Sequence, residues 1–450
     1  MTQNPRFIAV AVLNRVDEER SYAGPLLDHC LSGEAFTEKS DKALATNIVY
    51  GTLRRRGELD FLIGSFFRGD IDRMDTGIRN ILRTALFQIL HTDRIPPYAA
   101  VNEAVEMTKK AYPGRSGLVN GILRNIVRSL GRLPCPALGD DPMFPLSVQL
   151  SHPPWLLRKW IFELGEEEAK ALCEANNEIP PLTIRINRIK NDRSAIIENL
   201  RTEGWEAKPC RYATAGVHLY GSAVPVSETS YFREGLLQVQ DEASQMIAPF
   251  LDPLPGHRVL DLCAGAGIKT THLAELMENR GMIVAVDNKK RKIDELEVLS
   301  RRHGVSIIET VTADATEFLG EKYRGVFDRI LVDAPCSGLG TLRRNPEIKW
   351  QRQSGEIQGA AELQRRLLAA AVQYMKKGGV MVYSTCAISR EENEGNAGAF
   401  LDARPDFRRA SPPGHFPVEM LDGENSFRSY PHRHGTDGFY AVRLTTREKG

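Results

Sequence analysis

The sequence lacks several features that would place it quickly in a class of proteins. No run of apolar residues approaches the length that a membrane-spanning helix requires, so we expect no contact with a membrane. The N-terminus has neither a sustained apolar segment nor a cleavage site, which argues against a secretory signal. We find no internal repeat and no low-complexity tract, which argues against a repeat architecture.

Paired cysteines and an excess of charge are also absent. The 7 cysteines of this 450-residue chain are irregularly spaced and include no CxxC pair, so we expect neither a disulfide framework nor a metal site. Scattered free thiols fit a reducing cytosol, and we expect a cytoplasmic monomer. The formal net charge of +1 neither requires nor excludes a nucleic-acid ligand, because such binding depends on a local patch.

The length exceeds that of one ordinary domain, and the pattern changes along the chain. Residues 1–135 carry apolar residues at helical spacing in five runs, which predicts a compact all-α bundle. Four prolines over 134–145 predict a linker. Residues 150–230 combine a helix over 154–175 with a strand over 182–186 and further short elements, which predicts a small α+β unit.

The last part of the chain, residues 231–447, alternates strand and helix patterns. This alternation predicts an α/β domain with a doubly wound, mostly parallel, Rossmann-like sheet. In such sheets, ligands bind at the carboxyl ends of the strands near the point where the strand order reverses. Acids or thiols follow the predicted strands at this end. They are Asp261, Asp287, Asp314, Asp333, Cys336 and Cys386.

A glycine-rich loop joins the first strand of this sheet to its helix. Its residues are Cys263, Ala264, Gly265, Ala266, Gly267, Ile268 and Lys269. Glycines let the backbone approach a ligand closely and offer amide donors. Ile268 stands where a P-loop needs glycine, and Thr270 stands where a dinucleotide fingerprint needs one. S-adenosylmethionine has no pyrophosphate and tolerates a looser loop, so we predict that cofactor.

Two acids after the next strands fit the same cofactor. Asp287 suits the ribose hydroxyls, because a carboxylate accepts two hydrogen bonds from a diol. Asp314 is placed to meet the adenine edge. The alternative is that both acids merely cap the helices that follow them.

Cys336 and Cys386 each follow a predicted strand and lie in loops rich in proline, glycine, serine or threonine. Two thiols beside a cofactor pocket predict covalent catalysis on an electron-poor ring such as cytosine. A thiolate adds to C6, C5 then attacks a sulfonium methyl group, and a base removes the C5 proton. Asp333 is placed to bind the amino group and N3 of the ring. The residues alone do not say which thiol attacks. We assign four other cysteines to packing: Cys30, Cys173, Cys210 and Cys263.

Longer motifs around these residues resemble a known family. Residues 333–346, Ser384-Thr385-Cys386 with Glu392-Asn393-Glu394, and Asp437-Gly438-Phe439 are similar to the Sun/RsmB family of bacterial small-subunit ribosomal RNA cytosine-C5 methyltransferases. Gln240-Asp241-Glu242-Ala243-Ser244 resembles the segment that precedes the cofactor loop in that family. Residues 99–105 and 119–124 resemble its RNA-binding NusB domain.

The resemblance implies an enzyme that uses S-adenosylmethionine to make 5-methylcytosine in 16S ribosomal RNA. Residues 1–135 would be a NusB-like domain and residues 231–447 a class I methyltransferase domain, and the ribosomal RNA would be held by the helical domain and the α+β unit. The resemblance makes Cys386 the nucleophile and Cys336 the group that assists product release as a base. It places residues 263–269 and the acids in contact with the cofactor: Asp287, Asp314 and Asp333.

The chain departs from the family at two positions of the cofactor loop. Ala266 and Ile268 stand where proline and glycine are usual, which predicts weaker cofactor binding. The same departure motivates an alternative, an inactive fusion that binds RNA as a chaperone or antitermination factor. A further alternative is the same chemistry on transfer RNA. A nicotinamide-dependent oxidoreductase would need a catalytic histidine or a tyrosine–lysine pair, which we do not find.

Overall fold

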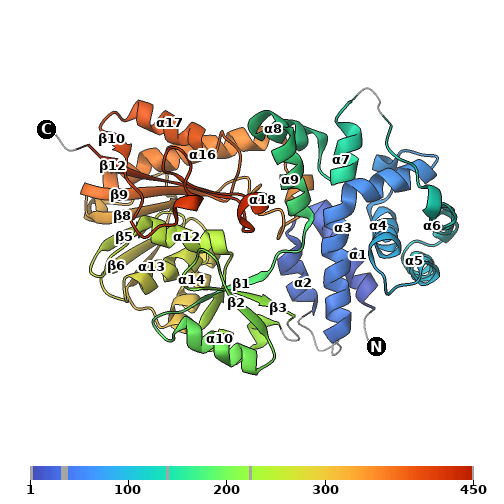
Figure 1. Ribbon diagram of the computed structural model, residues 1–450, viewed down its shortest axis with the longest axis horizontal. Coiled ribbons are helices and arrows are strands. Elements are labelled where there is room, and N and C mark those ends of the chain that lie inside the picture. The colour runs from blue at the N-terminus through green and yellow to red at the C-terminus, as the bar shows by residue number, and fades with distance from the viewer. Residues whose placement is uncertain (1–3, 32–38, 138–140, 222–224, 448–450) are drawn as a thin grey trace. The chain divides into compact units, whose positions relative to one another are not determined.

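Two compact units make up the chain in the computed structural model (Figure 1). The first unit comprises Met1–Glu178 and Leu342–Arg352, and the second comprises Ile179–Thr341 and Gln353–Gly450. No helix in the part of the chain that the structure describes is long and apolar enough to cross a membrane. The structure describes residues 4–31, 39–137, 141–221 and 225–447.

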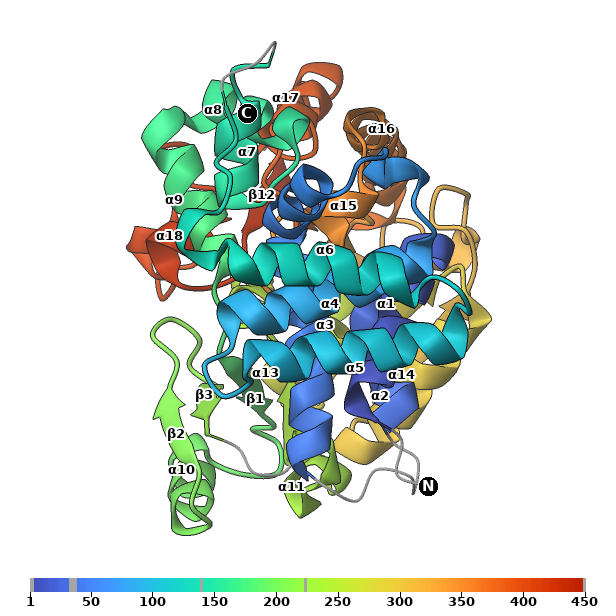
Figure 2. The same cartoon turned by 90° about the vertical axis from the view of Figure 1, so that its right-hand side faces the viewer.

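The first unit is built from helices. Its bundle comprises α1 (Pro5–Glu19), α2 (Ala23–Leu31), α3 (Lys39–Phe66), α4 (Thr76–His91), α5 (Pro97–Ala111) and α6 (Ser116–Arg128). All five predicted helices are present, whereas α2 was not predicted. Contacts with α1, α3, α5 and α6 bury α4 on nearly all sides, and Figure 2 shows α5 and α6 lying side by side. The prediction of an all-α bundle is confirmed.

Three more helices follow the bundle, α7 (Phe144–Leu150), α8 (Pro154–Leu164) and α9 (Glu166–Asn177). We predicted a single helix over 154–175, but Gly165 adopts φ 87°, a left-handed conformation that breaks the helix in two. The contacts group α8 and α9 with the first unit, whereas we had assigned them to the α+β unit. The predicted linker also ends earlier than expected, because α7 begins at Phe144.

A late segment of the chain, Leu342–Arg352, belongs to the first unit. It contains the short helix α15 (Ile348–Gln351). The fully buried Lys349 donates hydrogen bonds to the carbonyl oxygen of Arg54 (2.9 Å) and to Asn177 Oδ1 (2.9 Å). Trp350 Nε1 donates to the carbonyl oxygen of Leu53 at 2.8 Å. These contacts fasten the segment to α3 and α9.

The second unit begins with a small antiparallel sheet of order β2-β3-β1-β4. Helix α10 packs against β2 and β3. The predicted strand over 182–186 matches β1, so the α+β prediction holds for this part of the chain. The elements are β1 (Leu182–Ile186), α10 (Arg193–Thr202), β2 (Glu206–Pro209), β3 (Gly216–Tyr220), α11 (Ser230–Arg233) and β4 (Leu237–Val239).

The large sheet has the order β10-β12-β9-β8-β5-β6-β7, with β11 paired to β12. Strands β5 to β9 run parallel, as predicted, whereas the strands added at the β9 side are antiparallel. In Figure 1, α16 and α17 cover one face and α12 and α13 the other. The strands are β5 (Arg258–Asp261), β6 (Met282–Asp287), β7 (Ile308–Thr312), β8 (Phe327–Asp333), β9 (Met375–Thr385), β10 (Phe407–Arg409), β11 (Phe427–Ser429) and β12 (Phe439–Thr446). The helices are α12 (Glu242–Leu251), α13 (Ile268–Leu276), α14 (Lys290–His303), α16 (Ser354–Ala371), α17 (Glu394–Ala403) and α18 (Pro431–His434).

A buried arginine joins the small sheet to the large one. Arg185 on β1 is fully buried, and its guanidinium donates to the carbonyl oxygen of Ile268 (2.8 Å), to Thr271 Oγ1 (3.0 Å) and to Glu275 Oε1 (2.9 Å). Burial opposes ionisation of Glu275, but Arg185 and a hydrogen bond from His303 lower the pKa of Glu275 to about 2. Because all three acceptors lie on α13, the small sheet is fixed to the helix that follows the glycine-rich loop.

Candidate active site at the carboxyl ends of β5, β8 and β9

The strand order reverses between β5 and β8, and Asp261 and Asp333 are the last residues of these two strands. Parallel pairing sets Asp333 of β8 opposite Ser384 of β9, so the loops that follow begin side by side. Ser384 Oγ donates to Asp333 Oδ1 at 2.8 Å. Cys336 Sγ and Cys386 Sγ lie 3.1 Å apart, and both residues are half-buried. The two thiols therefore face one small space.

The two sulfurs have different environments. The hydrogen bond with Cys386, burial, and the nearby charges of Cys386 and Glu392 hold the pKa of Cys336 well above its ordinary value. Burial and this contact therefore both favour the neutral thiol at Cys336. Sequence reasoning could not distinguish the thiols, and the structure shows that Cys336 is the one beside Glu392.

Lys269 reaches the same space from the cofactor loop. Its Nζ donates to Asp333 Oδ2 at 2.7 Å and lies 5.3 Å from the centre of the Phe439 ring. Burial opposes the charge of Lys269, but Asp333 and the neighbouring Cys386 leave its pKa above the ordinary value. We had predicted Lys269 as a cofactor residue, and the structure places its ammonium group on Asp333.

The glycine-rich loop over 263–269, the predicted cofactor loop, adopts the conformation that its glycines permit. Gly265 has φ 55° and Gly267 has φ 85°. A Cβ on Gly267 would lie 2.5 Å from Leu296 Cγ on α14, whereas a Cβ on Gly265 would meet no atom within 4 Å. Ala266 and Ile268 line a largely apolar cavity of about 480 Å³ against α14.

Asp287 and Asp314 make backbone contacts of the kind that the capping alternative predicts. Asp287 accepts from the Gly265 amide (3.0 Å) with one oxygen and from the Lys289 amide (2.8 Å), just before α14, with the other. The exposed Asp314 accepts from the amide and hydroxyl of Thr316, both at 2.8 Å, and so caps a turn. Asp287 thus touches both the cofactor loop and the start of a helix, while Asp314 touches neither.

Four carboxylates act on the first residue of the loop. Burial raises the pKa of Cys263 well above its ordinary value, and negative charge raises it further. A site with so many acids attracts cations. The acids are Asp261, Asp287, Asp314 and Asp333.

Sequence reasoning gave Asp261 no role beyond ending a strand. Asp261 is buried, and Thr270 Oγ1 donates to its Oδ2 at 2.8 Å. Burial raises the pKa of Asp261 to about 7, despite the hydrogen bond from Thr270. Its place at the end of the strand that precedes the loop is the signal that could have identified it.

Glu392 and Asn393 hold the two thiol loops, a role that sequence reasoning also missed. The buried Glu392 accepts from Ser337 N (2.7 Å), Ser337 Oγ (2.5 Å) and Ser389 Oγ (2.5 Å). Asn393 Oδ1 accepts from Thr385 Oγ1 at 2.6 Å. One residue therefore fixes the loop after Cys336, and the next fixes the strand end before Cys386. The Glu392-Asn393-Glu394 motif was the available signal.

Gly340 and Gly438 bring a third loop against the thiols. The Gly340 amide donates to the carbonyl oxygen of Cys386 (2.9 Å), and the Gly438 amide donates to the carbonyl oxygen of Gly340 (2.7 Å). A Cβ on Gly340 would lie 2.0 Å from the Gly438 oxygen, so only glycine fits there.

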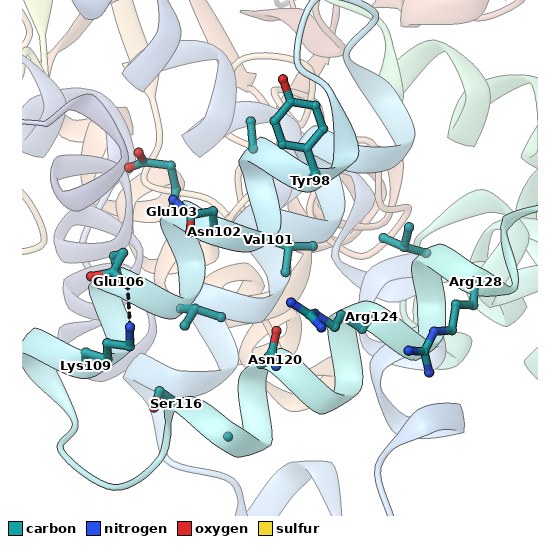
Figure 3. Close-up of a pocket in the computed structure, with 14 residues that line it drawn as sticks. Tyr98, Val101, Asn102, Glu103, Glu106, Lys109, Ser116, Asn120, Arg124 and Arg128 are labelled. Atoms are coloured by element: carbon teal, nitrogen blue, oxygen red, sulfur yellow. Dashed lines mark hydrogen bonds and ion pairs between the residues drawn. The ribbon is translucent and has the colours of Figure 1, made fainter.

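The first unit contains a groove between α5 and α6 with a volume of about 980 Å³ (Figure 3). Arg124 and Asn120 project from α6 toward α5, and Tyr98 at the rim is 76% exposed. Two glutamates among the lining residues balance part of the positive charge, and Lys109 pairs with Glu106 at 2.6 Å. The lining includes the following polar residues: Asn102, Glu103, Glu106, Lys109, Ser116, Asn120, Arg124 and Arg128.

Family models match three parts of the chain. The model described as 16S rRNA methyltransferase RsmB/F matches residues 248–445. The NusB family matches residues 3–128, and the ferredoxin-like domain of RsmF/B-like methyltransferases matches residues 152–227. This last match starts between α7 and α8, which the contacts assign to the first unit.

Curated relatives cover almost the whole chain. The probable ribosomal RNA small subunit methyltransferase B of Bacillus subtilis is 34% identical over 99% of both chains. The ribosomal RNA small subunit methyltransferase B of Pseudomonas syringae pv. tomato is 33% identical over 98% of this chain and 96% of its own.

Two solved structures are similar to this chain in fold and in sequence. The crystal structure of PH0851 is 28% identical, covers 99% of this chain and 100% of its own, and has a TM-score of 0.85. A methyltransferase homolog protein from Pyrococcus horikoshii is 30% identical over 67% of this chain and 97% of its own, with a TM-score of 0.58.

The separation of the two sulfurs predicts that they can be cross-linked. Mild oxidation with diamide should join Cys336 to Cys386, because their sulfurs need to move only about 1 Å closer to reach disulfide length. Peptide mapping by mass spectrometry under non-reducing conditions should find the 336–386 pair, and dithiothreitol should reverse it. Cys135, which is exposed, serves as the control thiol. Cross-linking of Cys135 in preference to this pair would contradict the geometry.

The raised pKa of Asp261 predicts a pH-dependent stability. The unfolded pKa is about 3.9, so between about pH 4 and 7 the folded chain holds a proton that the unfolded chain releases. Stability should therefore fall as pH rises through this window and level off above it. Asp261→Asn should remove this loss, so the variant should gain up to about 4 kcal/mol relative to the wild type between pH 4 and 7.

Urea unfolding at several pH values measures this difference, and Asp314→Asn is the matched control. Hydrogen bonds from Thr316 lower the pKa of Asp314, so its contribution should stay constant over the same window. Parallel pH curves for the wild type and Asp261→Asn would contradict the assignment.

Proposed function

The chain belongs to the RsmB/F family of 16S rRNA methyltransferases, and on that premise we propose that it methylates C5 of a cytosine in 16S rRNA. We propose S-adenosylmethionine as the methyl donor and a covalent bond between Cys386 and C6 of the ring as the intermediate. The observation that carries the proposal is the pair of sulfurs 3.1 Å apart beside Asp333 and Lys269.

The residues around the loop fit the proposed cofactor. S-adenosylmethionine is cationic at its sulfonium and amino groups, and the four carboxylates that act on Cys263 favour such a ligand. Gly265 leaves open space beside the loop, and Asp287 retains lone pairs for a ribose diol. When bound, the cofactor supplies an electrophilic methyl group. Asp314 would contribute at the adenine edge, as proposed from its place in the sequence.

The attacking sulfur in this proposal is Cys386. The ammonium group of Lys269 interacts electrostatically with Cys386, which fits an attacking sulfur that carries negative charge. Asp333 already accepts hydrogen bonds from Lys269 and Ser384, so it acts as an acceptor. An acceptor fits the exocyclic amino group of cytosine, which is a donor, and so orients the ring.

The same contacts support Cys336 as the base in product release. Its raised pKa depends first on the hydrogen bond with Cys386 and partly on the charge of that sulfur. Once Cys386 is bonded to C6 it is a neutral thioether, and both of these influences weaken. The thiol of Cys336 can then release its own proton to solvent, and the resulting thiolate takes the proton from C5 as the bond between Cys386 and C6 breaks.

The helical bundle is the proposed RNA-holding part. Its match to the NusB family and the groove between α5 and α6 support this assignment. Arg124 and Arg128 can pair with phosphates, and the exposed ring of Tyr98 can stack on a base. The target cytosine would have to leave its stack to reach the thiols.

Bisulfite sequencing of RNA from cells with and without the gene tests the proposal. One cytosine of 16S rRNA should resist conversion only when the gene is present. Loss of protection in transfer RNA instead would redirect the proposal to the alternative substrate. No change in any RNA would contradict it.

Alanine substitutions of the two thiols should have opposite effects on the covalent intermediate. Cys336→Ala should trap an RNA adduct, because release is blocked after attack. Cys386→Ala should form no adduct and lose activity by roughly 10³-fold or more. Denaturing gels with labelled 16S rRNA fragments detect the adduct in each variant, with Cys135→Ala as the control. Adduct formation by Cys386→Ala but not by Cys336→Ala would reverse the two roles.

A further inference from the structure

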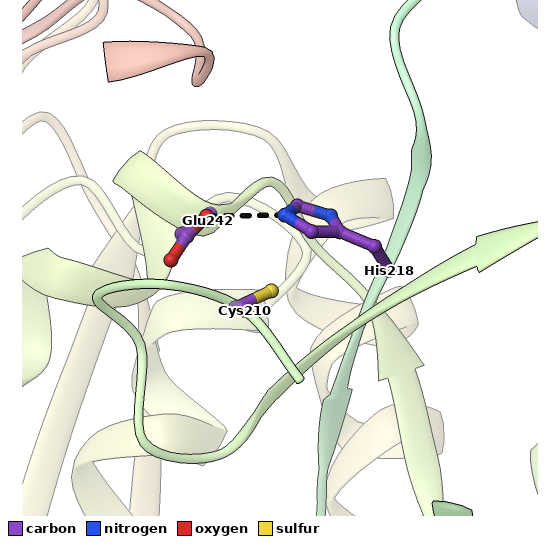
Figure 4. A group of neighbouring side chains, drawn as sticks. All are labelled: Cys210, His218 and Glu242. Carbon is purple, nitrogen blue, oxygen red and sulfur yellow. Dashed lines mark ion pairs between the residues drawn. The ribbon is translucent and has the colours of Figure 1, made fainter. Parts of the chain in front are cut away.

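Three metal-ligating side chains converge at a second place in the second unit (Figure 4). Cys210 follows β2, His218 lies on β3, and Glu242 is the first residue of α12. One ligand atom from each lies within 4.8 Å of the others. Sequence analysis assigned Cys210 to packing and expected no metal, because the three residues belong to no familiar spacing and meet only in the folded chain.

The carboxylate of Glu242 is held from one side. Glu242 is 2% exposed, and its Oε1 accepts from the amides of Tyr212 (2.5 Å) and Ala213 (3.0 Å). Its Oε2 lies 3.2 Å from His218 Nε2. One oxygen is therefore fixed by the backbone, and the other is directed into the cluster.

The imidazole of His218 is also oriented. Its Nδ1 lies 3.1 Å from Thr183 Oγ1, which is 3.3 Å from the carbonyl oxygen of Pro181. When the hydroxyl donates to that carbonyl, Nδ1 carries the ring proton and Nε2 presents a lone pair to the Glu242 carboxylate. In that tautomer, a metal ion placed between Nε2 and Oε2 would bind both atoms, whereas the other tautomer donates its Nε2–H to the carboxylate. Histidines that bind metals are typically held through one ring nitrogen, as Thr183 holds Nδ1 here, while the other nitrogen faces the metal.

The thiol of Cys210 is fixed by its hairpin. The Cys210 amide donates to the carbonyl oxygen of Gly216 at 3.0 Å, and a Cβ on Gly216 would lie 2.7 Å from the Cys210 sulfur. The sulfur thus occupies the space that a side chain at position 216 would take. A soft sulfur and an imidazole nitrogen favour zinc over magnesium or calcium, which prefer oxygen ligands alone.

We propose that Cys210, His218 and Glu242 bind one Zn²⁺ ion, with water in the fourth position. Binding releases the thiol proton of Cys210, so a thiolate and a carboxylate balance the two positive charges of the ion. The ion fastens the β2–β3 hairpin to α12. The proposal stands apart from the methyl transfer, since it involves none of the residues at the carboxyl ends of the strands.

Cobalt titration of the untagged full-length protein tests the site, because thiolate-bound Co²⁺ absorbs in the near ultraviolet. Absorbance should rise to one equivalent and be abolished by added Zn²⁺. Cys210→Ser should remove the band, and Cys135→Ser should leave it unchanged. No thiolate band in the wild type, or a band that persists in Cys210→Ser, would overturn the proposal.

A second measurement does not depend on substituting a ligand. Thr183→Val removes the hydroxyl that orients His218 while nearly preserving side-chain volume, and should weaken Zn²⁺ binding by about 10-fold to 100-fold. Competition with a chromophoric chelator measures the affinity, and circular dichroism checks folding. Zn²⁺ should also raise the unfolding temperature of the wild type in a concentration-dependent way. Equal affinity in the wild type and Thr183→Val would contradict the role of this histidine.

Discussion

The parallel pairing of β8 with β9 is the constraint on which the site depends. The register that sets Asp333 opposite Ser384 starts two loops at neighbouring points, and each loop carries one of the thiols. Side chains alternate along a strand, so a slip of one residue would turn Asp333 or Ser384 to the opposite face of the sheet. The hydrogen bond between these two side chains ties the register to the site itself.

Around this pairing, buried polar contacts hold the loops that carry the two thiols. Glu392 and Asn393 each bind the backbone or hydroxyl groups next to one thiol. The loop that contains Gly438 packs closely against Gly340, whose amide binds the carbonyl oxygen of Cys386. Satisfied polar networks of this kind specify one arrangement, because any alternative leaves a buried group without a partner. The motifs at 392–394 and 437–439 therefore act through the positions of the thiols.

The sequence predicted the parts of this structure that depend on local pattern. The strand that ends at Asp333, the glycine loop and the helices of the bundle all follow from spacing and composition. It did not predict the pairing of Lys269 with Asp333, because that contact joins the start of α13 to the end of β8, which are far apart in the sequence. The antiparallel strands beside β9 were also missed, since short edge strands such as β10 carry little periodicity. The break at Gly165 depends on one backbone angle that spacing cannot reveal.

The assignment of Leu342–Arg352 to the first unit has a consequence for how such a protein could be taken apart. Cutting the chain once, after Glu178, would separate α3 and α9 from Lys349 and Trp350, which donate hydrogen bonds to them. A gene that encodes only residues 1–178 would yield helices without these hydrogen-bond donors. The helical unit is thus not a detachable module, and recombination would have to carry two distant stretches of coding sequence to move it intact.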